Sequence, residues 1–79
     1  MTQYDQYSEA LAIAERMEAC GLRRHAVDIR NSIDDGVSGT EIFMKLRFYL
    51  VSIATAKELD VETRARIRVL IEHLNAALE

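Results

Sequence analysis

Apolar side chains recur at intervals of three and four residues along most of the chain, which is the spacing of one face of an α-helix. The chain has no proline, so its three glycines and a few capping residues mark the breaks in this pattern. The pattern predicts four helices, over about residues 4–20, 22–35, 39–59 and 61–78. Because short turns favour antiparallel neighbours, we expect an all-α fold: a compact antiparallel bundle of four helices in one domain, residues 1–79.

Each predicted helix has one apolar face that we assign to the core. The first helix ends at Gly21, as a helix with a left-handed C-terminal residue would, and Gly36 closes the second. Asp60 is the expected N-cap of the fourth helix. The core positions are Ala10, Ile13, Ala14 and Met17, with Tyr7 and Leu11 beside them; Leu22, Ala26, Ile29 and Ile33; Ile42, Leu46, Tyr49, Leu50 and Ile53; and Ile67, Leu70, Ile71, Leu74 and Leu78.

The stretch DDGVSGTEIF, residues 34–43, holds two of the glycines between carboxylates and large apolar residues. It lacks the alternating oxygen ligands of a calcium loop, and it has no Lys followed by Ser or Thr to hold a phosphate. It does fit a capping box, in which Ser38 accepts from the first turn of the third helix and Glu41 accepts from the Ser38 N–H. Thr40 is the competing N-cap. We therefore interpret the stretch as a helix stop followed by a capped helix start.

The composition is typical of a soluble globular protein, with 49% hydrophobic and 29% charged residues. No apolar stretch approaches the roughly 20 residues that span a bilayer, and the N-terminus lacks the regions of a signal peptide. We therefore expect no membrane association and a cytoplasmic location. A chain of 79 residues buries only about 60% of its unfolded surface, so its stability is marginal and self-association would raise it.

Residues able to carry catalysis or to bind a metal are few and badly spaced. Cys20 and His25 lie five residues apart across a glycine, and together with His73 they match no zinc-binding spacing. A single cysteine cannot form an internal disulfide, which agrees with a reducing compartment. There is also no glycine-rich cofactor loop and no convergent polar cluster. We therefore predict a protein that is not an enzyme and that has no catalytic residues, no metal and no cofactor.

Eight of the ten basic residues are arginine, and pairs of them could hold a phosphate or carboxylate in a bidentate contact. The candidate anion contacts are Arg23, Arg24, Arg64 and Arg68. The alternative is a solvated helix face with local ion pairs, from Asp60 to Arg64 and from Glu62 to Arg66, at the favourable spacing of four residues. The net charge of -3 gives no overall attraction to nucleic acid, so the sequence disfavours nucleic-acid binding.

The third predicted helix carries two apolar faces. Besides its core face it has a second stripe, formed by Met44, Phe48 and Val51, which are spaced four and three residues apart on a different side. Either this helix is central and touches neighbours nearly all round, or the stripe is exposed and meets another molecule. Methionine and phenylalanine both suit an adaptable contact between proteins. Met44, Phe48 and Val51 are therefore the candidate partner-binding residues.

The stretch AERMEACGLRRHAVDIRNSIDDGVSGTEIFMKLRFYLVSI, residues 14–53, resembles a loose set of small, mostly uncharacterised bacterial helical proteins. The shared features are a helix, a Gly-x-x-Gly-Thr-Glu-Ile turn and a helix rich in leucine and arginine. The run from Asp35 through Gly39 to Leu50 is also similar to the turn and helix of small immunity proteins that neutralise bacterial toxins. This resemblance implies a binding role and carries over no catalytic residues.

Together these features predict a non-enzymatic protein–protein interaction module that binds another protein or itself, with self-association through the third helix. The first alternative is a toxin-neutralising immunity or inhibitor protein that uses the same helix or an acidic face against a foreign target. The second alternative is a nucleic-acid accessory factor that uses the arginine pairs.

Overall fold

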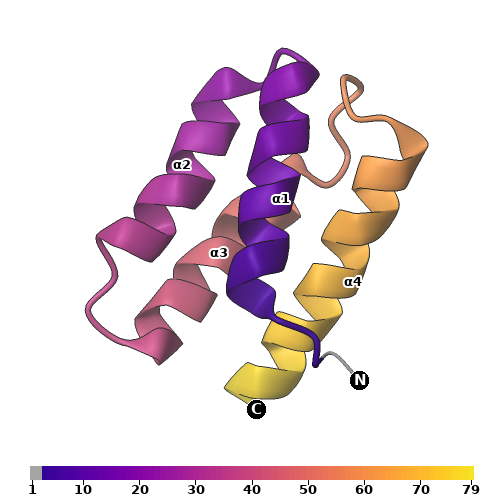
Figure 1. Cartoon of the computed structure of the whole chain (residues 1–79). Coiled ribbons are helices and arrows are strands. Elements are labelled where there is room, and N and C mark those ends of the chain that lie inside the picture. The colour runs from indigo at the N-terminus through magenta and orange to yellow at the C-terminus, as the bar shows by residue number, and fades with distance from the viewer. Residues whose placement is uncertain (1–2) are drawn as a thin grey trace.

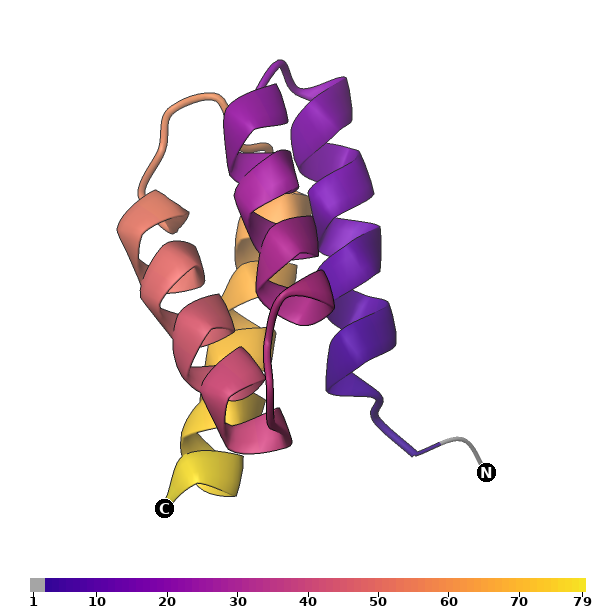
Figure 2. The same ribbon diagram turned by 90° about the vertical axis from the view of Figure 1, so that its left-hand side faces the viewer.

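The computed structural model describes residues 3–79, and this part of the chain forms four helices without a strand: α1 (Gln6–Ala19), α2 (Arg23–Asp34), α3 (Gly39–Ile53) and α4 (Val61–Leu78). Consecutive helices run antiparallel, and α4 returns to pack beside α1, so that each helix contacts two neighbours (Figure 1). Figure 2 shows α2 in front, with α1 and α3 on either side of it and α4 behind. The predicted all-α bundle of four helices is confirmed.

The core lies where the four apolar faces meet. Its largest fully buried apolar side chains come from all four helices and are Ile13, Met17, Ile29, Leu46, Leu50, Ile67, Leu70 and Leu74. The predicted inner faces are confirmed except at Leu11, which is exposed because it lies on the solvent side of α1. Six other predicted positions are only partly buried: Tyr7, Ile33, Ile42, Tyr49, Ile71 and Leu78.

Local hydrogen bonds explain where α1 begins and ends. Asp5 is the N-cap, and its carboxylate accepts from the Tyr7 N–H at 2.9 Å, so the helix begins at the next residue, later than predicted. At the other end, Gly21 has a φ of +86° and the Leu22 N–H donates to the Met17 carbonyl at 2.8 Å. The left-handed stop at Gly21 is therefore confirmed, and it turns the chain directly into α2.

The turn between α2 and α3 fixes where α3 begins. The Ser38 hydroxyl accepts from the Glu41 N–H at 3.2 Å, which confirms Ser38 as the N-cap and makes the Thr40 alternative wrong. The Glu41 carboxylate accepts from the Val37 N–H at 2.7 Å. The predicted bond to the Ser38 N–H is wrong, because the Glu41 side chain reaches one residue further back into the turn.

α3 ends at Ile53, well before the predicted end at residue 59. Residues 54–60 form a turn in which the Ala56 N–H donates to the Ile53 carbonyl at 2.9 Å. The Arg64 guanidinium donates to the carbonyls of Ala56 (3.0 Å) and Leu59 (3.3 Å), which ties the turn to α4. Leu59 is buried, so its side chain continues the apolar pattern although the helix has stopped. The longer predicted helix is wrong because a contact from α4 stabilises this turn.

Candidate functional site

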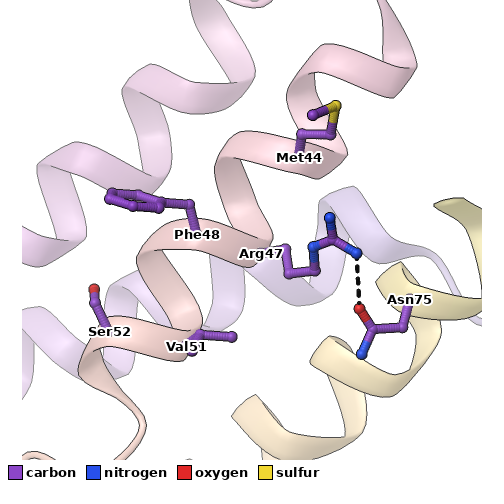
Figure 3. A pocket seen from close by; sticks show the side chains of 6 residues that line it. All are labelled: Met44, Arg47, Phe48, Val51, Ser52 and Asn75. Atoms are coloured by element: carbon purple, nitrogen blue, oxygen red, sulfur yellow. Dashed lines mark hydrogen bonds between the residues drawn. The ribbon is translucent and has the colours of Figure 1, made fainter.

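The outer side of α3 exposes three large apolar side chains in one row. Met44, Phe48 and Val51 are 53%, 69% and 56% exposed, whereas Leu46 and Leu50 on the opposite side are fully buried. The main packing neighbours of α3 are α2 and α4. The predicted alternative, in which α3 is central and touches neighbours nearly all round, is therefore wrong. We call Met44, Phe48 and Val51 the α3 stripe; Figure 3 shows it from close by.

A shallow, open groove lies between the α3 stripe and α4. It has a volume of about 640 Å³, and its lining consists of the α3 stripe with Arg47, Ser52 and Asn75; we call it the α3 groove. The Arg47 guanidinium donates to Asn75 Oδ1 at 3.0 Å, which links α3 to α4 beside the groove (Figure 3). Asn75 was not predicted from the sequence. One feature of the sequence could have pointed to Asn75: it lies one helical turn after Ile71, which packs at the edge of the core.

Phe48 is held in position although it is exposed. Its ring lies edge-on to the ring of Tyr49, with centroids 5.4 Å apart and planes at 77°. Tyr49 is itself partly buried and packs against the core. A side chain that is already fixed loses less conformational entropy on binding, so this contact favours Phe48 as the anchor of an interface.

Charges near the α3 stripe are few and already paired. Lys45 Nζ lies 3.5 Å from Glu41 Oε1, and Arg47 is bonded to Asn75. The Val37 N–H, and after it Lys45, hold the pKa of the Glu41 carboxyl below its ordinary value. Among the described residues that line the α3 groove, none is acidic. The surface is therefore apolar at its centre and weakly basic at its edge.

Both ion pairs predicted along α4 are wrong, because Arg64 bonds to the turn after α3 and the other charged side chains reach across to α1. The Arg66 guanidinium donates to both oxygens of the Glu9 carboxylate, at 2.8 and 2.7 Å, and does not pair with Glu62. Glu62 instead accepts from Arg16 at 2.6 Å, and Arg16 also lies 3.6 Å from Asp60. The bond from Arg66 holds the pKa of the Glu9 carboxyl below its ordinary value. These pairs join α1 to α4, so their role is structural.

The four arginines proposed as anion contacts do not form one patch. Arg23 and Arg24 are exposed at the start of α2, and Arg68 is exposed on α4. α2 and α4 lie diagonally across the bundle (Figure 1). Arg64 donates to carbonyls of the turn after α3 instead of pairing with Asp60 as predicted. Its guanidinium is therefore engaged within the fold and poorly placed to hold an anion.

Cys20 and the histidines do not come together with carboxylates in the described chain. Within residues 3–79, no three His, Cys, Asp or Glu side chains lie close enough together to hold a metal ion. Cys20 is a free thiol, partly buried at the end of α1. Over the same residues, none of the helices combines the length and the apolar character that crossing a lipid bilayer requires.

Comparisons with family models, curated protein sequences and solved structures gave no match to this chain. The resemblance to small bacterial helical proteins and to immunity proteins therefore stays a prediction. The candidate site is defined by its own geometry: an exposed apolar row on α3, a groove toward α4, and a single bonded arginine at the edge.

Proposed function

We propose that this chain is a non-enzymatic protein-interaction module that binds its partner through the α3 stripe and the α3 groove. One observation carries the proposal: Met44, Phe48 and Val51 form a continuous apolar row on one helix, and each is more than half exposed. Single exposed apolar residues, such as Val37 and Val61, are normal on protein surfaces. A contiguous group is different, because it is typical of a site that another molecule covers.

The α3 stripe has a pattern that fits a partner helix. Its members are spaced four and three residues apart, which is the spacing at which one helix packs along another. Methionine adapts its shape to a partner, and phenylalanine buries a large apolar area, so both are frequent in protein contacts. The partner in this proposal therefore supplies the apolar face of a helix.

Arg47 and Asn75 offer the partner a polar contact at the edge of the apolar surface. A guanidinium has five N–H donors, and among the described residues Arg47 uses one of them in a side-chain hydrogen bond, to Asn75. The remaining donors can bond to a carbonyl or carboxylate of the partner. This contact would fix the register of the partner more than its affinity, as rim charges usually do.

A photo-cross-linking amino acid in place of Phe48 tests this proposal in the cells that express the protein. The matched control carries the same amino acid in place of Val27, an isolated apolar residue of α2 that is 42% exposed. We expect a discrete cross-linked product from position 48 and none from position 27. Equal labelling from both positions, or no product from position 48, would contradict the proposal.

A further inference from the structure

The α3 stripe has the pattern of a helix that packs against a copy of itself. Met44, Phe48 and Val51 are spaced four and three residues apart, as at successive a and d positions of a heptad. α3 therefore has two seams, one toward its own core and one toward solvent. Two identical outer seams can interdigitate about a two-fold axis, because such a contact uses the same patch twice.

The charge distribution favours a second copy on this face. The net charge is -3, so two copies repel each other wherever their carboxylates meet. Exposed carboxylates that form no ion pair among the described residues lie on each of the other three helices: Glu15 on α1, Asp34 on α2 and Glu72 on α4. α3 has a single carboxylate, Glu41, and it is paired with Lys45. A two-fold contact through α3 therefore avoids the like-charge repulsion that contact through the other helices brings.

Arg47 does not oppose such a contact. In Figure 3 its side chain points toward α4 and away from Phe48, and it is bonded to Asn75 of its own chain. The two copies of this cation therefore lie beside the seam and outside its centre. The centre is left to the apolar side chains, of which Phe48 is the most exposed.

The area that a dimer needs indicates which other residues take part. A stable dimer buries about 800 Å² of each partner, which is roughly a sixth of the 5160 Å² surface of this chain. Three side chains supply only part of that area. A dimer of this size must also cover the α3 groove and the adjoining edge of α4, where Asn75 lies.

We infer that the partner of the α3 stripe is the α3 stripe of a second copy of this chain, packed about a two-fold axis that passes close to Phe48. This inference rests on the proposed function and adds the identity of the partner. In the dimer, the two Phe48 rings lie near the axis, and each copy closes the α3 groove of the other.

Sedimentation equilibrium of the full chain over a wide concentration range tests the inference. We expect the mass to rise from 9.0 kDa toward twice that value as the concentration increases. Phe48→Asp should raise the Kd of the dimer by about 30-fold or more, the change typical of a hot-spot residue. Val27→Asp is the matched control on α2 and should leave the Kd unchanged. A chain that stays at 9.0 kDa up to about 1 mM, or a Kd that Phe48→Asp leaves unchanged, would overturn the inference.

A second variant keeps the test decisive if Phe48→Asp does not fold, which far-UV circular dichroism will show. Phe48→Cys, made together with Cys20→Ser so that the chain has one thiol, should form an interchain disulfide under mild oxidation because position 48 lies near the axis. Val27→Cys in the same background should form no interchain disulfide, because position 27 lies on α2 and outside the proposed contact. If no disulfide forms and the photo-cross-link from position 48 goes to a different protein, the inference is overturned and the proposed function stands. Absence of both products would overturn both.

Discussion

Gly36→Ala should destabilise the protein, because the turn before α3 has no room for a side chain there. An added Cβ would overlap Ile42 Cγ1, and it would lie 3.0 Å from the Ser32 carbonyl oxygen. Among residues 3–79 only Gly21 has a positive φ, so the requirement at Gly36 is space and not backbone conformation. Relief of the overlap needs a shift of Ile42, which packs against the core in the first turn of α3.

The expected loss is a sizeable fraction of the total stability. Overpacking of a well-packed site costs about 1–3 kcal/mol, whereas a domain of 79 residues has about 4–12 kcal/mol in all. For a domain of this size, 1 kcal/mol corresponds to about 4–8 °C in Tm. We therefore expect the Tm of Gly36→Ala to be lower than that of the wild type by roughly 4–24 °C.

Thermal and urea denaturation, followed by far-UV circular dichroism, measure this loss. Gly39→Ala is the matched control, because the nearest atom to its added Cβ is Tyr7 Oη at 3.5 Å and the residue is the first of α3. Alanine favours a helix over glycine by up to about 1 kcal/mol, so this change should be neutral or stabilising. The steric reasoning is refuted by a Gly36→Ala protein that melts within about 2 °C of the wild type, or by an equal loss in Gly39→Ala.

Three further predictions concern the α1–α4 contact, the turn after α3 and the two faces of α3. Glu9→Gln weakens the two hydrogen bonds from Arg66, so urea denaturation at pH 7 should show a loss of about 1–2 kcal/mol. Because the folded protein holds the pKa of the Glu9 carboxyl below its ordinary value of 4.5, this stability is present above that value and is lost as the pH falls through the folded pKa. The wild type should thus lose more stability than Glu9→Gln between about pH 5 and pH 2, and equal losses would count against the pair. Arg64→Met removes the donor to two carbonyls of the turn after α3. Amide hydrogen exchange in that turn should accelerate, and the free energy of unfolding should fall by about 1–2 kcal/mol. Unchanged exchange would contradict the role of Arg64 in stabilising the turn. Phe48→Ala removes only the ring contact with Tyr49 and should lower the free energy of unfolding of the monomer by at most about 1.5 kcal/mol. Leu50→Ala should cost about 2–5 kcal/mol; similar losses from both would mean that Phe48 belongs to the core.

The helices could be predicted from the sequence because their signals are local. The spacing of the apolar residues and the caps Ser38 and Asp60 lie within one or two turns of the elements that they define. The end of α3 could not be predicted in this way. Residues 54–60 contain neither Gly nor Pro, and the buried Leu59 continues the apolar pattern. A hydrogen bond from Arg64 on the next helix stabilises the turn, and spacing along the chain does not show such a contact.

The candidate site was visible in the sequence only in part. The pattern placed the α3 stripe off the core face, but its exposure depends on how many helices surround α3, which is a property of the assembled bundle. The contacts that border the site or hold the bundle join distant residues. Arg47 and Asn75 are 28 positions apart, and Glu9 and Arg66 are 57 positions apart. Rules for neighbours on one helix do not reach that far, and for α4 they predicted the wrong partners.

The α3 stripe needs an explanation outside the monomer, because it adds little to the fold. Its exposed fractions, 53%, 69% and 56%, correspond to nearly two whole apolar side chains left in water. Burial of that surface contributes about 3–5 kcal/mol per chain, or roughly 6–10 kcal/mol when two copies meet. Association itself costs about 4–15 kcal/mol, so the apolar gain is of the same size as the cost. A weak, reversible dimer that forms as the concentration rises is the result that these magnitudes favour, and neighbouring contacts from the α3 groove decide how tight it is.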